Sequence, residues 1–513
     1  MLFRSARFFM SWSPAQAPAG APPSSLAAPA FAYTAEASQA HDQALQAGGL
    51  TALQLMRRAA EAAYATLRQS WPKAEALAVL AGPGHNGGDG AVLAGLAQQR
   101  GLRCTLYYLA SPKTETARRA KDFAAAAGVT MAPLAAFDPD GMDVLVDALL
   151  GTGPARPVTE SLAALFEQIN ELSLPVLALD LPSGLAADTG AAPGAVLRAS
   201  VTQSLLLPKR GAYTGEARNW VGEVTHADLA CSPPALAPPG TVRLLGASPM
   251  GTLPRPAAAH KGVFGRVLVV AGGTGMGGAG LLAAEAALRA GAGAVTLATA
   301  PEHLAPALAR CPELMVRGAE HRRDLDSLLA LADVVVLGPG LGLNGWAQGL
   351  FGRVLEAGLP TVFDADGLTL LARSASPLPF PGLLTPHPGE AGRLLGWPTA
   401  AVEADRFAAA EALWLRYGVP VVLKGAGALV ADDSGLAVSL GGNSAMATAG
   451  MGDVLAGLTA GLWAQGLAPA QALTAAVQLH GAAGDRAAQL RGPSLLARDL
   501  FPELGPLLTA FAS

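Results

Sequence analysis

Short runs of consecutive apolar residues, each followed by an Ala/Leu-rich stretch, recur along this sequence. Runs that are apolar at every position are typical of strands buried on both faces, as in parallel sheets covered by helices. Ligands bind at the carboxyl ends of the strands in such sheets, so functional residues are expected just after each run. The runs are Leu77–Ala81, Cys104–Leu109, Val144–Val146, Val176–Leu179, Val267–Ala271, Val295–Thr299, Val334–Leu337, Thr361–Phe363 and Val421–Leu423.

A proline-rich segment, Cys231-Ser-Pro-Pro-Ala-Leu-Ala-Pro-Pro-Gly240, divides these runs into two groups. Proline removes backbone donors and favours extended chain, so this segment predicts a linker. A chain of 513 residues is also too long for one ordinary core. We therefore predict two α/β domains, at 31–232 and 256–513, a linker at 233–255 and a disordered tail at 1–30. Since no motif is divided between them, we expect the two domains to work independently.

Composition excludes several classes of protein. The net charge of −4 provides no basic footprint for nucleic acid. No apolar run reaches the roughly 18 to 20 residues that cross a bilayer, so we expect no membrane association. The three cysteines are scattered without metal-ligand spacing. Their pattern indicates free thiols in a reducing compartment, and we expect a cytoplasmic protein.

The first run ends in a glycine-rich loop, Gly82-Pro-Gly-His-Asn-Gly-Gly-Asp-Gly90, which leads into a helical stretch. Glycine lets the backbone approach a ligand closely, and the free N–H groups at a helix start suit phosphate. Such a loop can also be a turn without a ligand. The polar Asn86 and Asp89 within it favour a binding site.

Two later runs in the first half end in aspartate. Asp147 continues into Ala-Leu-Leu-Gly-Thr-Gly153, and Asp180 continues into Leu-Pro-Ser183-Gly. One such aspartate can be a helix cap or a turn residue. Several strand ends together offer carboxylate, amide and hydroxyl oxygens, which are the hard ligands that suit a cation.

The strongest pattern in the second half is Thr448-Ala-Gly-Met-Gly-Asp-Val-Leu-Ala-Gly457. A Gly-Met-Gly turn before a small-residue helix forms a backbone anion site at the helix N-terminus. Asp453 would then act as a base beside the phosphate that the amides hold. The alternative is a glycine-rich helix start with a capping aspartate.

The loop at 82–90, Asp-Ala-Leu-Leu-Gly-Thr-Gly and Asp-Leu-Pro-Ser-Gly resemble, in that order, the YjeF N-terminal family of NAD(P)HX epimerases. The resemblance covers Tyr33 to Cys231 and implies a potassium site at Asn86, Asp147 and Ser183. It also implies proton transfer by Asp180. The sequence departs from the family at His85, where asparagine is usual, and in the opening pattern Leu55-Met-Arg-Arg-Ala59. The implied substrate-binding residues are His85, Asn86, Gly87, Gly88, Asp89, Gly151, Thr152, Gly153, Pro154, Ala155, Arg156, Pro157 and Asp180.

The decapeptide at 448–457 is similar to the signature of ribokinase-like folds. Other motifs single out the NAD(P)HX dehydratase family over Pro256 to Leu508. They are the segments at 260–279, 286–293 and 337–342, Asp364-Ala-Asp-Gly, Leu384-Thr-Pro-His-Pro-Gly-Glu390 and Leu423-Lys-Gly-Ala-Gly427. The resemblance implies that Asp453 deprotonates the hydroxyl of the hydrated cofactor. The implied contacts are Ala279, Gly340, His387 and Asp453 for the hydrated cofactor, and Lys424, Gly425, Ala426, Gly427, Ala428 and Gly452 for the nucleotide.

These resemblances predict a Rossmann-like three-layer sandwich followed by a ribokinase-like three-layer sandwich. The implied function is repair of hydrated nicotinamide cofactors: epimerisation of R- and S-NAD(P)HX, and ADP-dependent dehydration of the S form to NAD(P)H. The implied cofactors are K⁺ in the first domain and Mg²⁺ with ADP in the second. We expect NADHX, NADPHX and ADP as small-molecule partners, and a homo-oligomer. The alternative is a small-molecule kinase of the ribokinase fold with a non-catalytic N-terminal binding module.

Overall fold

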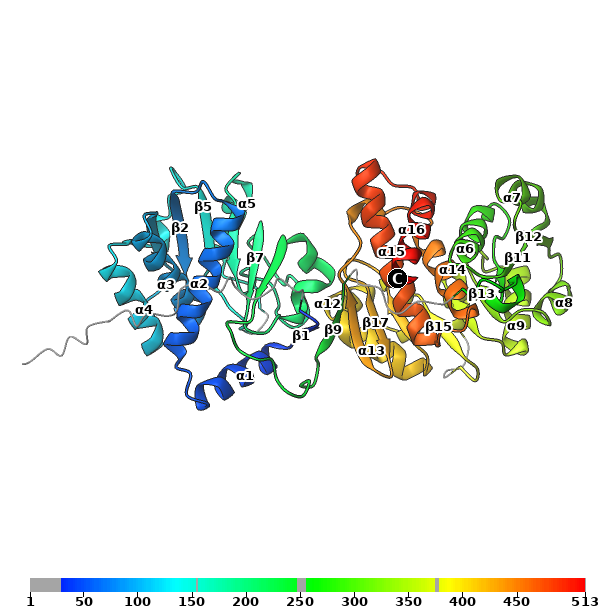
Figure 1. The fold of residues 1–513 in the computed structure, drawn as a ribbon, viewed down its shortest axis with the longest axis horizontal. Helices are drawn as coiled ribbons and strands as arrows, with labels where there is room; N and C mark the ends of the chain where they lie inside the picture. The colour runs from blue at the N-terminus through cyan, green and yellow to red at the C-terminus, as the bar shows by residue number, and fades with distance from the viewer. Residues whose placement is uncertain (1–28, 154–155, 247–254, 374–377, 513) are drawn as a thin grey trace, which may run out of the picture.

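The computed structural model describes residues 29–153, 156–246, 255–373 and 378–512. They form two α/β domains, which lie side by side along the long axis of the molecule (Figure 1). This confirms the predicted fold class. Most of the predicted tail, Pro154 and Ala155 lie outside the described residues.

The first domain is built on a sheet of seven parallel strands. Helices α2, α3 and α4 pack on one face and α5 packs on the other, so apolar cores form on both faces. In spatial order the strands are β4 (Thr130–Pro133), β3 (Arg103–Tyr108), β2 (Ala76–Ala81), β5 (Val144–Ala148), β6 (Val176–Leu179), β7 (Val201–Leu205) and β8 (Glu223–Ala227). The helices are α1 (Ala35–Ala47), α2 (Ala52–Ser70), α3 (His85–Gln99), α4 (Glu115–Ala126) and α5 (Glu160–Glu171).

The second domain is built on a mixed sheet of eleven strands. Its central strands are parallel, while β17 pairs antiparallel with both of its neighbours. In spatial order the strands are β1 (Phe31–Ala32), β9 (Val242–Leu245), β18 (Gly435–Ser439), β17 (Leu429–Asp432), β16 (Val421–Leu423), β15 (Gly382–Leu384), β14 (Thr361–Phe363), β13 (Val334–Leu337), β10 (Arg266–Val270), β11 (Ala294–Thr299) and β12 (Met315–Gly318).

Helices cover both faces of the second sheet. One core joins the sheet to α6, α14, α15 and α16, and another joins it to α9, α10, α11 and α13. The helices are α6 (Gly277–Arg289), α7 (Leu304–Arg310), α8 (Asp326–Leu329), α9 (Gly345–Ala357), α10 (Ala365–Leu371), α11 (Pro388–Leu395), α12 (Thr399–Ala404), α13 (Arg406–Tyr417), α14 (Met451–Ala464), α15 (Pro469–Arg491) and α16 (Phe501–Ala512). Within the described part of the chain, no helix is long and apolar enough to cross a membrane.

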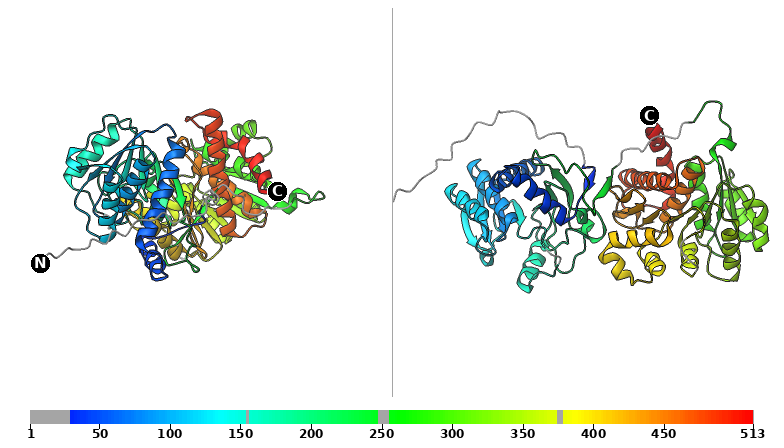
Figure 2. Two further views of the ribbon diagram at one scale, coloured as in Figure 1. Left: turned by 60° about the vertical axis from the view of Figure 1, so that its left-hand side comes forward. Right: turned by 90° about the horizontal axis from the view of Figure 1, so that it is seen from below.

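The two domains are joined by a strand pairing and by an apolar core. Strand β1, which lies at the start of the first domain in sequence, pairs antiparallel with β9 at the edge of the second sheet (Figures 1 and 2). The predicted linker at 233–255 contains β9, which pairs with β18, so this segment is not all connector. One buried cluster contains Leu185 and Tyr213 of the first domain together with Phe407 of the second. The two domains are therefore packed against each other, and the expectation that they work independently stays a prediction.

Candidate active sites

A cavity of about 330 Å³ opens where β2, β5 and β6 of the first sheet end. The glycines of the 82–90 loop allow the loop to close on the end of β5. A Cβ atom on Gly82 would lie 1.8 Å from the carbonyl oxygen of Leu149, and one on Gly87 would lie 1.9 Å from that of Gly82. Of the residues predicted to bind the hydrated cofactor, those that line the cavity are His85, Asn86, Gly87, Asp89, Gly151, Thr152, Gly153 and Asp180.

Three predicted substrate residues lie elsewhere. Gly88 faces helix α2, where an added Cβ would lie 2.5 Å from the Cε atom of Met56. Arg156 and Pro157 are not among the residues that line the cavity. Gly88 is therefore placed to let α3 pack closely against α2.

Asp180 forms an ion pair inside this cavity with a lysine that the sequence analysis did not select. Its Oδ1 atom lies 2.5 Å from the Nζ atom of Lys209, and it also accepts from the backbone N–H of Leu205 at 3.2 Å. The side chain of Lys209 is only 4% exposed. Asp180 has a positive φ of 68°, which non-glycine residues adopt at some cost and which is common at functional sites.

A second carboxyl group, that of the half-buried Asp89, lines the same cavity. Desolvation raises the pKa of Asp89 well above the ordinary value. The nearby charges of Asp180 and Asp42 raise the pKa of Asp89 further, while Lys209 lowers it. The cavity therefore combines one ion-paired carboxylate with one carboxyl group whose pKa is raised.

The three residues predicted to hold a cation are joined through Leu150. Asn86 donates from Nδ2 to the carbonyl oxygen of Leu150 at 2.7 Å, and the N–H of Leu150 donates to Oγ of Ser183 at 2.9 Å. Ser183 in turn donates from Oγ to Oδ1 of Asp147 at 2.6 Å and from its N–H to Oδ2 at 2.7 Å.

Asp147 is fully buried, and desolvation raises its pKa, while hydrogen bonds from Ser183 and Leu149 lower it. These partners are all neutral, so a monovalent cation would supply charge that they do not. Carboxylate, hydroxyl and amide oxygens are also the donors that such a cation prefers. The residues Asn86, Asp147 and Ser183 therefore fit a monovalent cation such as K⁺.

In the second domain, Asp453 lies in the first turn of helix α14. Gly450 caps this helix with a left-handed φ of 92°, which glycine adopts without strain. A Cβ on Gly452 would lie 3.0 Å from Nζ of Lys424. Gly452 and Lys424, which were both predicted to contact the nucleotide, are therefore neighbours. Burial and the charge of Asp364 raise the pKa of Asp453 to about 7, against the opposing effect of Lys424.

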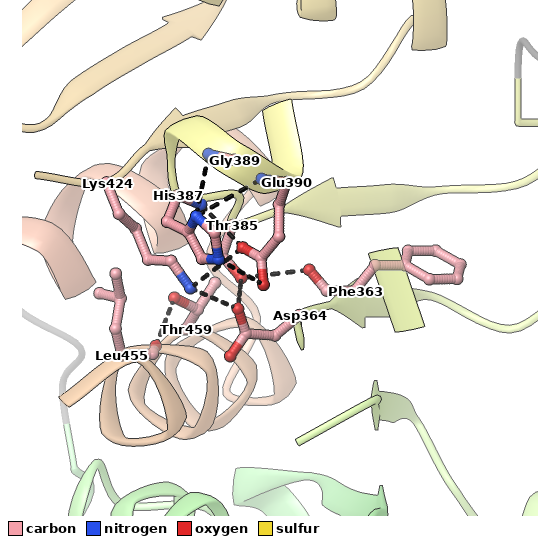
Figure 3. A network of polar contacts seen from close by, with 9 residues as sticks. All are labelled: Phe363, Asp364, Thr385, His387, Gly389, Glu390, Lys424, Leu455 and Thr459. Atoms are coloured by element: carbon pink, nitrogen blue, oxygen red, sulfur yellow. Dashed lines mark hydrogen bonds and ion pairs between the residues drawn. The ribbon is translucent and has the colours of Figure 1, made fainter. Parts of the chain in front are cut away.

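Lys424 is the centre of a buried network of polar side chains (Figure 3). Its Nζ atom lies 2.6 Å from Oδ1 of Asp364 and 3.8 Å from Oε2 of Glu390. Asp364 also accepts from the hydroxyl of Thr385 at 2.8 Å. These two carboxylates raise the pKa of Lys424 although burial opposes them, so Lys424 is a cation held next to Asp453.

The residues predicted to contact the hydrated cofactor fall into two places. Gly340 and Ala279 are neighbours, since a Cβ on Gly340 would lie 3.1 Å from that of Ala279. His387 instead caps α11 beside the Lys424 network, and its Nδ1 accepts from the N–H of Gly389 at 3.0 Å (Figure 3). Burial and the charge of Lys424 lower the pKa of His387, which favours the neutral ring.

Sequence reasoning gave no site role to four charged residues of these sites: Asp42, Lys209, Asp364 and Glu390. Asp364 and Glu390 lie in motifs that carry the dehydratase resemblance, and Asp364 also follows the apolar run Thr361–Phe363, so these signals could have identified them. Lys209 offers a weaker signal, as one of few lysines in the chain.

Comparison with known proteins agrees with this two-domain arrangement. Residues 52–211 match the family model described as YjeF-related protein N-terminus, and residues 267–505 match the model described as NAD(P)H-hydrate dehydratase. The chain is thus a fusion of two α/β enzyme domains.

Whole-length relatives define the family. A bifunctional NAD(P)H-hydrate repair enzyme of Coxiella burnetii is 45% identical over 90% of this chain and 96% of its own. One from Escherichia coli is 40% identical over 92% of both chains. The structure of an ADP/ATP-dependent NAD(P)H-hydrate dehydratase from Bacillus subtilis, co-crystallised with ATP and Mg²⁺, is 30% identical, with a TM-score of 0.46, over 51% of this chain and 95% of that chain. This chain belongs to the bifunctional NAD(P)H-hydrate repair enzymes, which confirms the epimerase and dehydratase resemblances.

Proposed function

We propose that the first domain interconverts R- and S-NAD(P)HX, and that the second dehydrates S-NAD(P)HX with ADP as the phosphoryl donor. The observation that supports the second step best is the position of Asp453 at the start of α14, with Lys424 beside it. The first domain contributes a cavity with one ion-paired carboxyl group and a second whose pKa is raised.

Dehydration needs a leaving group better than hydroxide. Asp453 accepts the hydroxyl proton of the hydrate as the oxygen attacks the β-phosphoryl group of ADP, which releases AMP. Loss of phosphate from one ring carbon, together with a proton from the neighbouring ring carbon, then forms the double bond of NAD(P)H. The N–H groups of Gly450 to Gly452 hold the transferring phosphate, as helix N-termini do. Lys424 supplies a positive charge beside them, and Mg²⁺ would neutralise phosphate charge as it does for other nucleotides.

In the first domain, Asp180 carries the proton transfer of epimerisation, and Lys209 holds its carboxylate in place. Asn86, Asp147 and Ser183 would hold K⁺, whose charge would offset that of the buried Asp147. We also propose a homo-oligomer in the cytoplasm, where thiols such as the buried Cys104 and Cys311 stay reduced.

The test uses chemically hydrated NADH, which contains both epimers. With ADP and Mg²⁺, the purified protein should convert both epimers to NADH, measured by absorbance and by chromatography of the remaining hydrate. Without nucleotide it should interconvert the epimers and produce no NADH. Phosphorylated hydrate that accumulates without NADH would indicate a kinase instead, and consumption of one epimer alone would show that the first domain is inactive.

A further inference from the structure

The loop at 424–428, which we propose to contact the nucleotide, rests on a segment of the first domain. The hydroxyl of Thr214 donates to the carbonyl oxygen of Gly427 at 2.7 Å, and the N–H of Gly215 donates to that of Ala426 at 2.9 Å. A Cβ on Gly427 would lie 1.9 Å from the carbonyl oxygen of Tyr213. The two backbones are therefore in direct contact across the domain boundary.

Arg406 completes this contact from the second domain. Its Nε donates to the Thr214 hydroxyl at 3.0 Å, and its Nη2 donates to the carbonyl oxygens of Leu423 and Lys424 at 3.3 and 3.0 Å. Thr214 is fully buried, and Arg406 is only 1% exposed. Buried polar groups that lose a partner are costly, so these bonds define one arrangement of the loop.

The arrangement also directs the N–H groups of the loop. In a trans peptide, the C=O of one residue and the N–H of the next point in opposite directions. The carbonyls of Lys424, Ala426 and Gly427 are bound to Arg406 and to the first domain. The N–H groups of Gly425, Gly427 and Ala428 are consequently directed away from these donors, and successive backbone N–H groups of this kind bind anions.

We propose that Thr214 is a positioning residue for the nucleotide of the second domain, although it belongs to the first. The proposal rests on the nucleotide role of the 424–428 loop given above. The segment that carries Thr214 begins at Lys209, in the cavity of the first domain. One short stretch of chain thus touches both sites, and the nucleotide affinity of the dehydratase depends on a residue from the epimerase domain.

The test is Thr214→Val in the full-length chain, which keeps the shape of the side chain and removes the hydroxyl. We expect the KM for ADP, and the Kd from equilibrium titration with ADP, to rise about three- to tenfold, with kcat nearly unchanged. Thr214→Ser, which restores the hydroxyl, should restore the KM. If valine prevents folding, Thr214→Ala removes the same hydroxyl without adding volume.

Thr202→Val is the matched control. Thr202 is also fully buried in the first domain, and its hydroxyl donates at 2.6 Å to the carbonyl of Val221, which belongs to the same domain and not to the 424–428 loop. An unchanged KM in Thr214→Val, an equal rise in Thr202→Val, or a loss confined to kcat would overturn the proposal. Failure of the proposed function would appear differently, as a wild-type protein that neither binds ADP nor dehydrates the hydrate.

Discussion

Both domains place an aspartate–lysine pair at the carboxyl ends of their strands. Asp180 lies 2.5 Å from Lys209 in the first domain, and Asp364 lies 2.6 Å from Lys424 in the second. A buried ion pair of this kind contributes little net stability, because desolvation offsets the attraction. Its presence in each site is better explained by the charge that it holds next to the reacting groups.

The two pairs differ in the carboxyl group beside them. Asp89 of the first domain lines the cavity, and desolvation raises its pKa well above the ordinary value. Asp453 of the second lies in the first turn of a helix, and its pKa is raised to about 7. The carboxyl group of Asp453 therefore titrates near neutral pH, as the base that we propose for the second site requires.

The largest effect should come from Asp453→Asn, which keeps the size of the side chain and removes its basicity. Loss of a positioned general base costs ~10² to 10⁴ in rate, so dehydration should nearly stop. Nucleotide binding and epimerisation in the same sample should stay near normal and report correct folding. Turnover close to that of the wild type would show that another group is the base.

Asp180→Asn should produce the complementary loss in the first domain. Asparagine tolerates the positive φ at this position, so the backbone need not change. We expect epimer interconversion without nucleotide to fall roughly 10²-fold or more, while dehydration of the S epimer continues. Chromatography of the two epimers over time measures both rates. Equal losses in the two activities would contradict separate sites.

The sequence predicted nine strands that are mostly apolar, because burial on both faces leaves a nearly continuous apolar run. It did not reveal β7, where Thr202, Gln203 and Ser204 are all buried. The side chains of Thr202 and Gln203 are accommodated by hydrogen bonds, such as the one from Thr225 to Gln203 at 3.0 Å. The local sequence of β7 does not indicate such partners.

The residues of the candidate sites could also be predicted only in part. The glycine loop and the strand-end aspartates could be predicted, because the topology of a parallel sheet brings strand ends together. The roles of Lys209 and Arg406 could not be predicted, since the partners of these residues are distant in sequence and on other elements. The contact between domains was missed for the same reason, although it involves the predicted 424–428 loop.

The pH dependence of dehydration should reflect the pKa of Asp453. Because the base must be deprotonated, kcat/KM should fall about tenfold per unit as the pH drops below about 7. Asp364→Asn removes a neighbouring negative charge, so the pKa of Asp453 and the acidic limb should move to lower pH. Glu115→Gln, an exposed change in the first domain, serves as the control. If the acidic limb stays in place in Asp364→Asn, the limb does not reflect the pKa of Asp453.

A smaller effect is expected from the cation site. Asp147→Ala removes the carboxylate proposed to hold K⁺, and epimerisation should weaken several-fold, mainly through KM. The wild type should lose a similar amount when K⁺ is replaced by a larger organic cation at equal ionic strength, and the variant should not respond. Since Asp147 is fully buried, a thermal unfolding curve must show that the variant still folds. Normal epimerisation by the variant without K⁺ would reject the site.

The smallest effect should follow cleavage of the chain between the domains. A protease site inserted within 233–239 lies in largely exposed chain, so it can be cut. The fragments should nevertheless elute together and keep both activities, because β1 pairs with β9 and a shared apolar core joins the domains. Arg210 of the first domain also stacks on Phe407 of the second, with 4.7 Å between the guanidinium carbon and the ring centre. Fragments that separate freely, with ADP affinity unchanged in the second, would restore the independence expected from the sequence and remove the basis for the role of Thr214.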